Sequence, residues 1–319
     1  MQTQLADFIR NTAEGREADA ILRKCVHCGF CTATCPTYQL LGDELDGPRG
    51  RIYLIKQAFE GATVTSKTQL HLDRCLTCRA CETTCPSGVR YSRLLDIGRE
   101  VVEQRVQRGW RERTLRFVLC EGVPRRALFA ALFRLGKILR PFLPSVWADK
   151  LKTDAPPRGA WPRNNHSRKM LALAGCVQPT LAPDINAATA RVLDRLGIEL
   201  IEAPGAGCCG ALRFHLNAQE AARADARRNI DVWWPYLGRD CEAIVVTASG
   251  CGVMVEDYGH LLSEDADYAH KAARVSLLAC DIAEIIAAEQ EKLRIILQDA
   301  PRPASAVRIA FQSPCTLQH

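Results

Sequence analysis

The 319-residue sequence has no long hydrophobic run and no export signal. Its longest comparable apolar stretch, ALFAALF at residues 127–133, is far shorter than the roughly 20 residues that a membrane-spanning helix needs. The first fifteen residues are polar and amphipathic, without the apolar segment and small-residue cleavage site of a signal peptide. We therefore expect a cytoplasmic chain that does not itself cross a membrane.

The sequence also lacks the motifs of several enzyme classes. It contains no glycine-rich flavin or nucleotide fingerprint, no nucleophile elbow and no paired acid and base motif. The net charge of +6 is modest, and no motif that combines aromatic and basic residues accompanies it, so we expect no nucleic-acid partner. The informative residue type is instead cysteine.

Sixteen cysteines are present, and eight of them form two runs. The first run, Cys25–Pro36, reads CVHCGFCTATCP, and the second, Cys75–Pro86, reads CLTCRACETTCP. Disulfide scaffolds are small secreted proteins, so clustered cysteines in a cytoplasmic chain are more often metal ligands or redox centres. Both runs have the spacing C-x2-C-x2-C-x3-C-P, which is the ligand run of bacterial ferredoxins.

The spacing predicts two [4Fe–4S] clusters with crossed ligands, because the fourth cysteine of such a run binds the other cluster. The first predicted set is Cys25, Cys28, Cys31 and Cys85, and the second set is Cys75, Cys78, Cys81 and Cys35. Two zinc sites are the alternative, although zinc sites favour pairs of cysteines separated by a longer loop. His27 is either a Rieske-type ligand or, since four cysteines already complete the set, a loop residue beside the cluster.

Helical periodicity surrounds the two runs. Residues 47–62 and 90–109 each predict a helix with one apolar face. The inward positions are Ile52, Ile55, Phe59, Leu94, Ile97, Val101 and Val102. We expect residues 1–100 to form an α-helical ferredoxin domain with two [4Fe–4S] clusters.

A basic segment follows, with sixteen Lys and Arg against six Asp and Glu between Arg99 and Arg168. Within it, residues 125–144 predict a basic amphipathic helix. Such a helix can lie on an anionic membrane surface, dock against a partner protein or pack its apolar side onto a neighbouring domain. Residues 152–169 are rich in Pro, Gly and Asn and predict a linker. We treat residues 101–168 together as a basic helical linker.

Strands and helices alternate in residues 169–300. Strands are predicted over 170–175, 198–204 and 242–249, and helices over 183–197 and 217–234. Asp184 is expected to cap the first of these helices, with Ile185, Ala188, Val192 and Leu196 facing inward. This alternation predicts an α/β domain with a parallel sheet.

Four cysteines follow the predicted strand ends, where α/β folds place their chemistry. Cys176 follows the first strand, Cys208 and Cys209 follow the second, and Cys251 follows the third. Periodicity alone does not show that they meet, but their places make it plausible. Cys120, Cys241 and Cys280 lie in helical or linker contexts, where we expect small buried hydrophobic residues.

From about residue 20 onward, these motifs resemble the iron–sulfur proteins that carry cysteine-rich CCG repeats. This group includes members from heterodisulfide reductase and anaerobic glycerol-3-phosphate dehydrogenase, together with lactate-utilisation proteins and glycolate oxidase iron–sulfur subunits. The closest resemblance is to the last, through CVHCGFCTATCPTYQLLGDELDGPRGRIYLIKQ, CLTCRACETTCPSGVRY, NAATARVLDRLGI and TASGCG. It implies a mixed fold, in which a helical ferredoxin domain precedes an α/β cysteine-rich CCG domain.

The resemblance also implies a function. The chain would be the electron-transfer subunit of a membrane-associated glycolate dehydrogenase complex, with D-lactate or glycerol 3-phosphate as alternative substrates. Flavin (FAD) is expected on partner subunits only, which oxidise glycolate to glyoxylate, and the acceptor is a quinone or another respiratory carrier. The chain alone would not be catalytic. It would lie on the cytoplasmic face of the inner membrane, with residues 115–147 as the contact.

Two departures from the family pattern bear on the CCG domain. Ala248 stands where the repeat has the first cysteine of a C-x-x-C pair, and residues 301–319 match only the opening of a second repeat, so we expect a truncated form. By analogy with the noncubane clusters of heterodisulfide reductase, a third cluster on Cys176, Cys208, Cys209 and Cys251 is a hypothesis. The competing interpretations are a thiol–disulfide enzyme and an assembly scaffold without electron flow.

Overall fold

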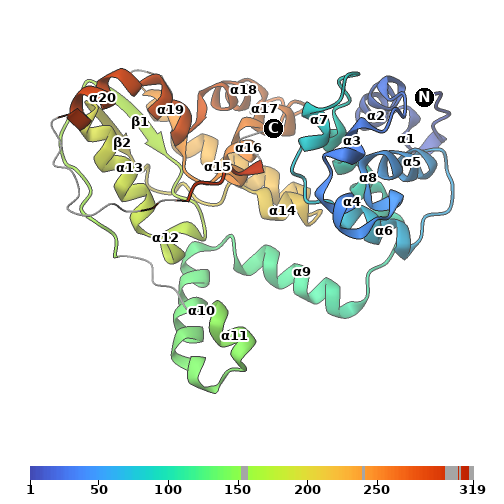
Figure 1. Cartoon of the computed structure of the whole chain (residues 1–319), viewed down its shortest axis with the longest axis horizontal. Coiled ribbons are helices and arrows are strands. Elements are labelled where there is room, and N and C mark those ends of the chain that lie inside the picture. The colour runs from blue at the N-terminus through green and yellow to red at the C-terminus, as the bar shows by residue number, and fades with distance from the viewer. Residues whose placement is uncertain (152–156, 239–240, 299–307, 309, 316–319) are drawn as a thin grey trace. The chain divides into compact units, whose positions relative to one another are not determined.

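The computed structural model describes residues 1–151, 157–238, 241–298, 308 and 310–315, which form two compact units (Figure 1). The first unit comprises Met1–Arg113 with the described residues from Phe311 on, and the second comprises the described part of Thr114–Ala310. The break after Arg113 falls inside the segment predicted as a linker. Residues 152–156 of that linker, and most of the expected second repeat at 301–319, lie outside the described residues.

The described residues of the first unit form helices and no strand. In chain order the helices are α1 (Asp7–Arg10), α2 (Ala13–Lys24), α3 (Phe30–Ala33), α4 (Pro36–Leu41), η1 (Glu44–Asp46), α5 (Pro48–Phe59), α6 (Ser66–Asp73), α7 (Ala80–Thr83) and α8 (Tyr91–Arg105). Helices α5 and α8 confirm the two helices predicted around the cysteine runs. All seven predicted inward positions on them are buried.

The core of the first unit lies between α2, α5 and α8. Helices α5 and α8 approach closely, because a Cβ at Gly98 would lie 2.6 Å from the side chain of Ile55. Gly50 is equally constrained, since its Cβ would lie 2.1 Å from the carbonyl oxygen of Glu44. Glycine at these positions lets α5 pack against both α8 and η1, and this packing fixes the loops that carry the cysteines.

The second unit combines helices with a small sheet. Its elements are α9 (Trp110–Gly122, which begins before the unit boundary), α10 (Arg126–Leu139), η2 (Arg140–Phe142), α11 (Ser145–Lys150), β1 (Arg168–Ala172), α12 (Gln178–Leu181), α13 (Asp184–Arg195), β2 (Ile198–Ile201), α14 (Ala211–His215), α15 (Gln219–Leu237), β3 (Cys241–Val246), α16 (Ser249–Glu256), α17 (Tyr258–Leu261), α18 (Ala269–Leu278), β4 (Ala279–Asp281), α19 (Ile282–Ala288) and α20 (Gln290–Gln298).

The four strands form one parallel sheet in the order β2-β1-β3-β4. Successive residues of β1 face opposite sides: Leu171 packs with α15, α16 and α18, whereas Met170 and Ala172 pack with α13 and α19. Both faces of the sheet are therefore covered by helices, as is usual for parallel sheets. This arrangement confirms the mixed fold class and the predicted α/β domain.

Three details of the α/β prediction are wrong. Strand β4 was not predicted, and it places Cys280 in the sheet, while Cys241 begins β3 rather than lying in a helix or linker. Asp184 does not cap α13, because the N-cap position is Pro183 and no side chain caps it. Ile185 and Val192 of α13 are 38% and 39% exposed, because smaller residues such as Ala187 and Ala190 face the sheet instead.

Candidate metal centres

The two cysteine runs adopt the same backbone conformation. His27 and Thr77, at equivalent positions, have φ angles of 56° and 53°, and Gly29 and Arg79 have φ angles of 86° and 62°. Non-glycine residues seldom adopt positive φ, and such strain gathers at functional sites. A short helix follows in each run, α3 in the first and α7 in the second. The repeat in the sequence is thus a repeat of two strained loops.

The first predicted set of cysteines surrounds one cavity. Its lining includes Cys25, Cys28 and Cys31 of the first run together with Cys85 of the second, and Cys81 contributes to the wall. The rest of the wall is mostly apolar. The cavity measures about 400 Å³ including the space open to solvent.

The second predicted set surrounds a separate cavity of the same size, about 400 Å³. Cys75, Cys78 and Cys81 of the second run line it, and Cys35 of the first run completes the four. Each cavity therefore contains the four cysteines of one predicted set, and Cys81 of the second set lines the first cavity as well.

The protein supplies few charges inside the cavities but several N–H donors. Burial raises the pKa of Cys25, and it raises the pKa of Cys31 to about 11. The backbone N–H of His27 points to Cys25, and that of Val89 lies 3.5 Å from the sulfur of Cys85. A bound cationic metal group would stabilise the thiolates that burial disfavours, and the N–H groups would share their charge.

A buried ionic network lies beside the second cavity, and sequence reasoning missed it. The Asp46 carboxylate is fully buried and pairs with Arg51 (3.5 Å), His71 (3.0 Å) and Arg74 (2.7 Å). Burial acts to raise the pKa of Asp46, but hydrogen bonds from His71 and Arg74 lower it below its ordinary value. The fully buried Arg51 side chain lines the cavity itself.

This network reaches a predicted ligand through Thr37. Arg51 donates from Nη1 to Thr37 Oγ1 at 3.1 Å, and the same oxygen lies 3.2 Å from the sulfur of Cys35. Thr37 also donates to the carbonyl oxygen of Asp46 at 2.8 Å. The sequence signal for this network, Arg51 in the helix predicted over residues 47–62 with Asp46 just before it, is weak because charged side chains are usually exposed.

Two orphaned polar atoms lie in the cavity walls. The hydroxyl of Tyr91 and Nε2 of His27 are buried and have no hydrogen-bond partner within the described structure. Burial raises the pKa of Tyr91 well above its ordinary value and lowers the pKa of His27. Buried polar atoms normally have partners, so these two indicate that a further group completes each cavity. The residues present fit a cluster in both places.

The four cysteines of the CCG segment also meet, as their positions after the strands suggested. The thiols of Cys176 and Cys208, of Cys208 and Cys209, and of Cys209 and Cys251 lie close enough to shift one another's pKa. Interaction with Cys176 and Cys209 holds the pKa of Cys208 well below its ordinary value. Accordingly, interaction with Cys208 and burial raise the pKa of Cys176.

The Cys208–Cys209 dipeptide is held by two buried polar side chains. Asn229 donates to the carbonyl oxygen of Cys208 at 2.8 Å and accepts from the N–H of Gly207 at 2.9 Å. Tyr258 donates to the carbonyl oxygen of Cys209 at 2.8 Å. Asn229 also donates to the Tyr258 hydroxyl at 3.1 Å, so the two side chains form one support.

None of the remaining described cysteines lines either cysteine cavity. Cys120 is buried as expected, whereas Cys241 and Cys280 are half-buried in the sheet. Cys315, which matches the opening of a second repeat, is exposed.

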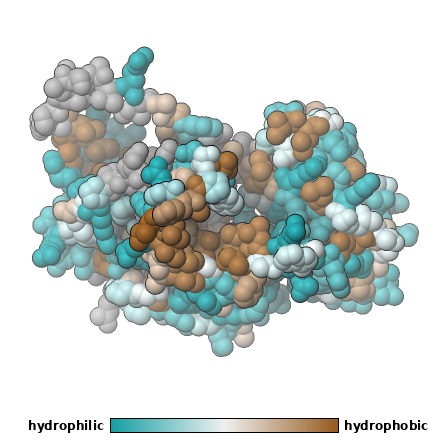
Figure 2. Space-filling model, turned by 90° about the horizontal axis from the view of Figure 1, so that it is seen from below, coloured by the Kyte–Doolittle hydropathy of each residue, from teal (hydrophilic) through white to brown (hydrophobic). Residues whose placement is uncertain are grey.

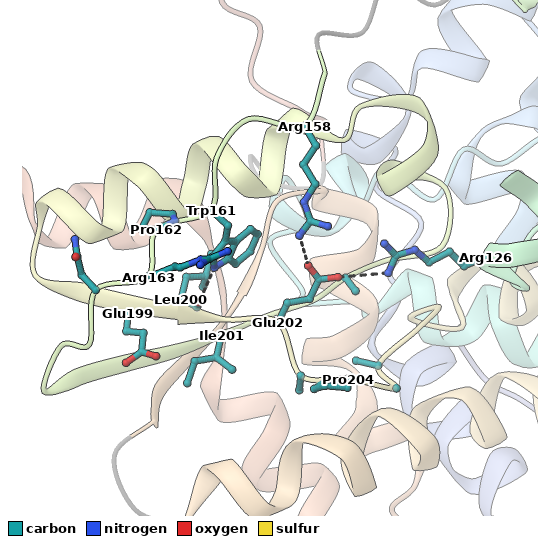
Figure 3. A pocket seen from close by; sticks show the side chains of 15 residues that line it. Arg126, Arg158, Trp161, Pro162, Arg163, Glu199, Leu200, Ile201, Glu202 and Pro204 are labelled. Atoms are coloured by element: carbon teal, nitrogen blue, oxygen red, sulfur yellow. Dashed lines mark hydrogen bonds and ion pairs between the residues drawn. The ribbon is translucent and has the colours of Figure 1, made fainter.

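A wider cavity of about 1060 Å³, including the space open to solvent, lies at the carboxyl end of β2 (Figure 3). Its lining contains none of the predicted site residues. Figure 3 shows Arg126 and Arg158 converging on Glu202, at 3.4 and 2.9 Å, so both arginines pair with the same carboxylate.

Apolar side chains are exposed over α9, α10 and α11. No residue of α10 is buried. Figure 2, which views the molecule from the side of α10 and α11, shows hydrophobic residues gathered on that face. They include Leu128, Leu132, Leu135, Ile138, Phe142, Val146 and Trp147. Within the described ranges, every helix falls short of the length or apolar character that crossing a bilayer requires.

Comparisons with known proteins agree with this description. Residues 21–89 match a family model described as a 4Fe-4S dicluster domain, and residues 170–256 match one described as a cysteine-rich domain. No solved structure matches the chain.

Three curated relatives give the context. The chain is 59% identical over 320 residues to the glycolate oxidase iron–sulfur subunit of Escherichia coli K12, covering 100% of this chain and 77% of that protein. It is 30% identical to the probable glycolate oxidase iron–sulfur subunit of Bacillus subtilis 168, covering 83% of this chain and 65% of that protein. It is 30% identical to lactate utilization protein A of Bacillus thuringiensis, covering 34% of this chain and 43% of that protein. The chain is therefore an iron–sulfur protein that belongs to the family of glycolate oxidase iron–sulfur subunits.

Proposed function

We propose that this chain is the electron-transfer subunit of a flavin-dependent glycolate dehydrogenase complex. The flavin, on partner subunits, would oxidise glycolate to glyoxylate, and the chain would carry the electrons toward a quinone or another respiratory acceptor. The observation that carries the proposal is the pair of four-cysteine cavities in a chain that shares 59% identity with a glycolate oxidase iron–sulfur subunit. The sequence contains no flavin fingerprint of its own.

The cavities would each hold one [4Fe–4S] cluster. The first set would be Cys25, Cys28, Cys31 and Cys85, and the second set Cys75, Cys78, Cys81 and Cys35. A bound cluster of this class accepts and releases single electrons, whereas glycolate oxidation delivers two. The chain's own residues hold the cysteines in two adjacent apolar cavities, limit the access of water and offer N–H groups to the sulfurs.

One experiment tests the substrate and the relay together. The native complex would be copurified under anaerobic conditions, and glycolate, D-lactate and glycerol 3-phosphate would be added separately. We expect glycolate to bleach the visible absorption of the clusters at the lowest concentration. Bleaching by D-lactate alone would place the chain nearer to the lactate-utilisation proteins. If no 2-hydroxy acid bleaches the clusters while the flavin becomes reduced, the relay is wrong.

The CCG site supports a second candidate function. Its four thiols lie close enough to shift one another's pKa, and interaction with Cys176 and Cys209 lowers the pKa of Cys208, which favours the thiolate that reacts in thiol–disulfide exchange. The alternatives are a third cluster on Cys176, Cys208, Cys209 and Cys251, or a thiol site that reduces a disulfide as in heterodisulfide reductase. Iron analysis distinguishes them. About eight irons per chain, unchanged by Cys209→Ser, would exclude a third cluster.

We further propose that residues 115–147 contact an anionic membrane on the cytoplasmic face of the inner membrane. The exposed apolar residues of α10 lie among Arg126, Arg134, Lys137 and Arg140, which is the composition of helices that rest in a lipid interface. The chain should sediment with vesicles of anionic lipid but not with vesicles of neutral lipid alone. Leu132→Glu should weaken this binding, whereas Leu277→Glu, at an even more exposed leucine of α18, should not. Binding that ignores both lipid charge and Leu132→Glu would contradict the contact.

A further inference from the structure

Tyr91, the first residue of α8, lies in the wall of both cysteine cavities. Its side chain is 4% exposed, and its hydroxyl is a buried donor without a partner in the described structure. A buried hydroxyl left unpaired is costly, so its presence at this point requires an explanation. The proposed clusters are the groups that the described cavities lack.

Tyr91 lines the second cavity together with Cys75, Cys81 and Arg51. Burial is the largest cause that raises the pKa of its hydroxyl, the thiols of Cys75 and Cys81 raise this pKa further, and the Arg51 guanidinium lowers it. Cys75 lines the second cavity only, whereas Cys81 lines both. No cysteine confined to the first cavity is among the groups that affect this pKa most.

The first run has no hydroxyl at the equivalent position of the repeat. Fifty residues before Tyr91, at the matching place in the repeat, stands Leu41, which is apolar and 47% exposed. His27 is the other orphaned residue, but the charged groups that act on it are Arg49, the N-terminus, Glu44 and Lys56, and no cysteine is among them. The two cavities are therefore built from the same run of cysteines but receive different side-chain donors.

We propose that the Tyr91 hydroxyl donates a hydrogen bond to the sulfur of Cys75 when the second cluster is bound, and thereby raises the reduction potential of that cluster. Ligand sulfur carries negative charge, and a cluster gains further negative charge when it accepts an electron. A hydrogen bond to the sulfur therefore stabilises the reduced state more than the oxidised state. The buried position strengthens the effect, because no water competes for the hydroxyl.

This inference rests on the proposed function only in requiring the two clusters. It makes Tyr91 a positioning residue for electron transfer, which sets how readily the second cluster accepts an electron. Its test uses dyes and a chemical reductant as the electron source, without glycolate or the flavin subunits. A failure of the relay and a failure of this inference would thus give different results.

The test is a redox titration of the cluster-loaded full chain, followed by electron paramagnetic resonance. Tyr91→Phe removes only the hydroxyl. At a fixed applied potential it should lower the reduced-to-oxidised ratio of one cluster about tenfold, a shift of about 59 mV for a one-electron couple. The other cluster should not shift. Tyr53→Phe, at an exposed tyrosine of α5, is the matched control and should shift neither.

Two further variants, each lacking one ligand cysteine, show which cluster changes its reduction potential when Tyr91 is replaced. Cys28 and Cys78 are equivalent positions of the two runs. In a Cys28→Ser chain, which retains the second cluster, Tyr91→Phe should still lower the potential. In a Cys78→Ser chain, which retains the first cluster, it should have no effect. An effect in the Cys78→Ser chain only, or in both backgrounds equally, would overturn the proposal.

A spectroscopic signature separates hydrogen bonding from a packing effect. After exchange into D2O, electron nuclear double resonance of the reduced second cluster should show an exchangeable proton that Tyr91→Phe removes. An unchanged proton pattern together with unchanged potentials would refute the hydrogen bond. Failure of the Tyr91→Phe chain to load its second cluster would assign the hydroxyl to cluster binding instead, and it would also refute the proposal.

Discussion

The two groups of cysteines differ in what governs their thiols. In the first unit eight cysteines line two cavities, and burial is the largest cause that raises the pKa of Cys25, Cys31, Cys78 and Cys81. In the CCG unit, interactions with a neighbouring thiol are the largest cause of the pKa shifts of Cys176, Cys208, Cys209 and Cys251. The cysteines of the first unit are thus governed mainly by their burial in the cavity walls, whereas those of the CCG unit are governed mainly by one another.

The two units also support their cysteines differently. Beside the second cavity the support is ionic, with Asp46, Arg51, His71 and Arg74 in one network. Around the Cys208–Cys209 dipeptide the support is neutral, through Asn229 and Tyr258. Ionic groups beside a cavity can compensate charge there, while neutral groups fix the backbone. The following predictions test this contrast.

The largest expected difference is in electron flow through the complex. Cys31→Ser should reduce glycolate-dependent reduction of a quinone acceptor to background, because it removes a ligand of the first cavity. The flavin should still be reduced by glycolate. Cys209→Ser should retain a larger share of the flow, and Cys241→Ser, outside every proposed set, should retain all of it. Equal loss in Cys31→Ser and Cys209→Ser would mean that both units carry the electrons.

Asp46→Asn should cause the largest loss of stability among the supporting residues. It leaves the fully buried Arg51 without its carboxylate, and breaking such a buried pair costs about 3–5 kcal/mol in the free energy of unfolding. Chemical denaturation of the cluster-loaded chain measures this loss in the free energy of unfolding. Asp7→Asn, at an exposed carboxylate, should change stability by about 0.5 kcal/mol or less. A similar small change for Asp46→Asn would show that the ionic network is dispensable.

Asn229→Ala should have a smaller effect in the CCG unit. It removes the partners of Cys208 O, Gly207 N–H and the Tyr258 hydroxyl, and unsatisfied buried groups cost about 1–3 kcal/mol. Asn165→Ala, at an exposed position, is the control. If Asn229→Ala leaves the unfolding free energy unchanged, the dipeptide is held by other contacts.

The interaction between thiols in the CCG unit predicts a dependence on pH. Cys208, with its lowered pKa, stabilises the fold above the unfolded thiol value of about 8.5 and loses this contribution as pH falls through its folded value. Cys176, with its raised pKa, contributes below about 8.5 and loses this contribution as pH rises. Together, the two cysteines should contribute most to the free energy of unfolding near pH 8.5.

The measurement compares the wild type with the double variant Cys176→Ser/Cys208→Ser. The stability advantage of the wild type should rise toward pH 8.5 by at most about 1.4 kcal/mol per pH unit and fall beyond it. A flat profile would mean that these sulfurs are ligated, which favours the third cluster.

Much of the fold could be predicted because short-range patterns determine it. The spacing of the two runs predicted which cysteines share a cavity, including the long-range pairing of Cys85 with the first run. The helices α5 and α8 followed from apolar periodicity. Strand β4 could not be predicted because it has only three residues and is defined by its pairing with β3. The prediction of which face of α13 points inward was wrong. It relied on the large apolar residues Ile185 and Val192, whereas alanines fill the close contact between this helix and the sheet.

The supporting residues of the sites could not be predicted in the same way. Asp46 and Arg51 are ordinary surface residue types, and only the tertiary packing of η1, α5 and α6 buries them. Tyr91 lies in a segment that reads as a helix start, and nothing in its neighbours shows that its hydroxyl is orphaned. These roles depend on which groups are missing around a side chain, and a linear sequence does not record that.

The crossed ligand sets are the central claim, and iron analysis of two double variants tests them most directly. Cys35→Ser/Cys75→Ser removes two ligands of one proposed set, so about four irons per chain should remain. Cys35→Ser/Cys25→Ser removes one ligand from each set, so almost no iron should remain. The opposite result, with about four irons in Cys35→Ser/Cys25→Ser and almost none in Cys35→Ser/Cys75→Ser, would show that each run binds its own cluster.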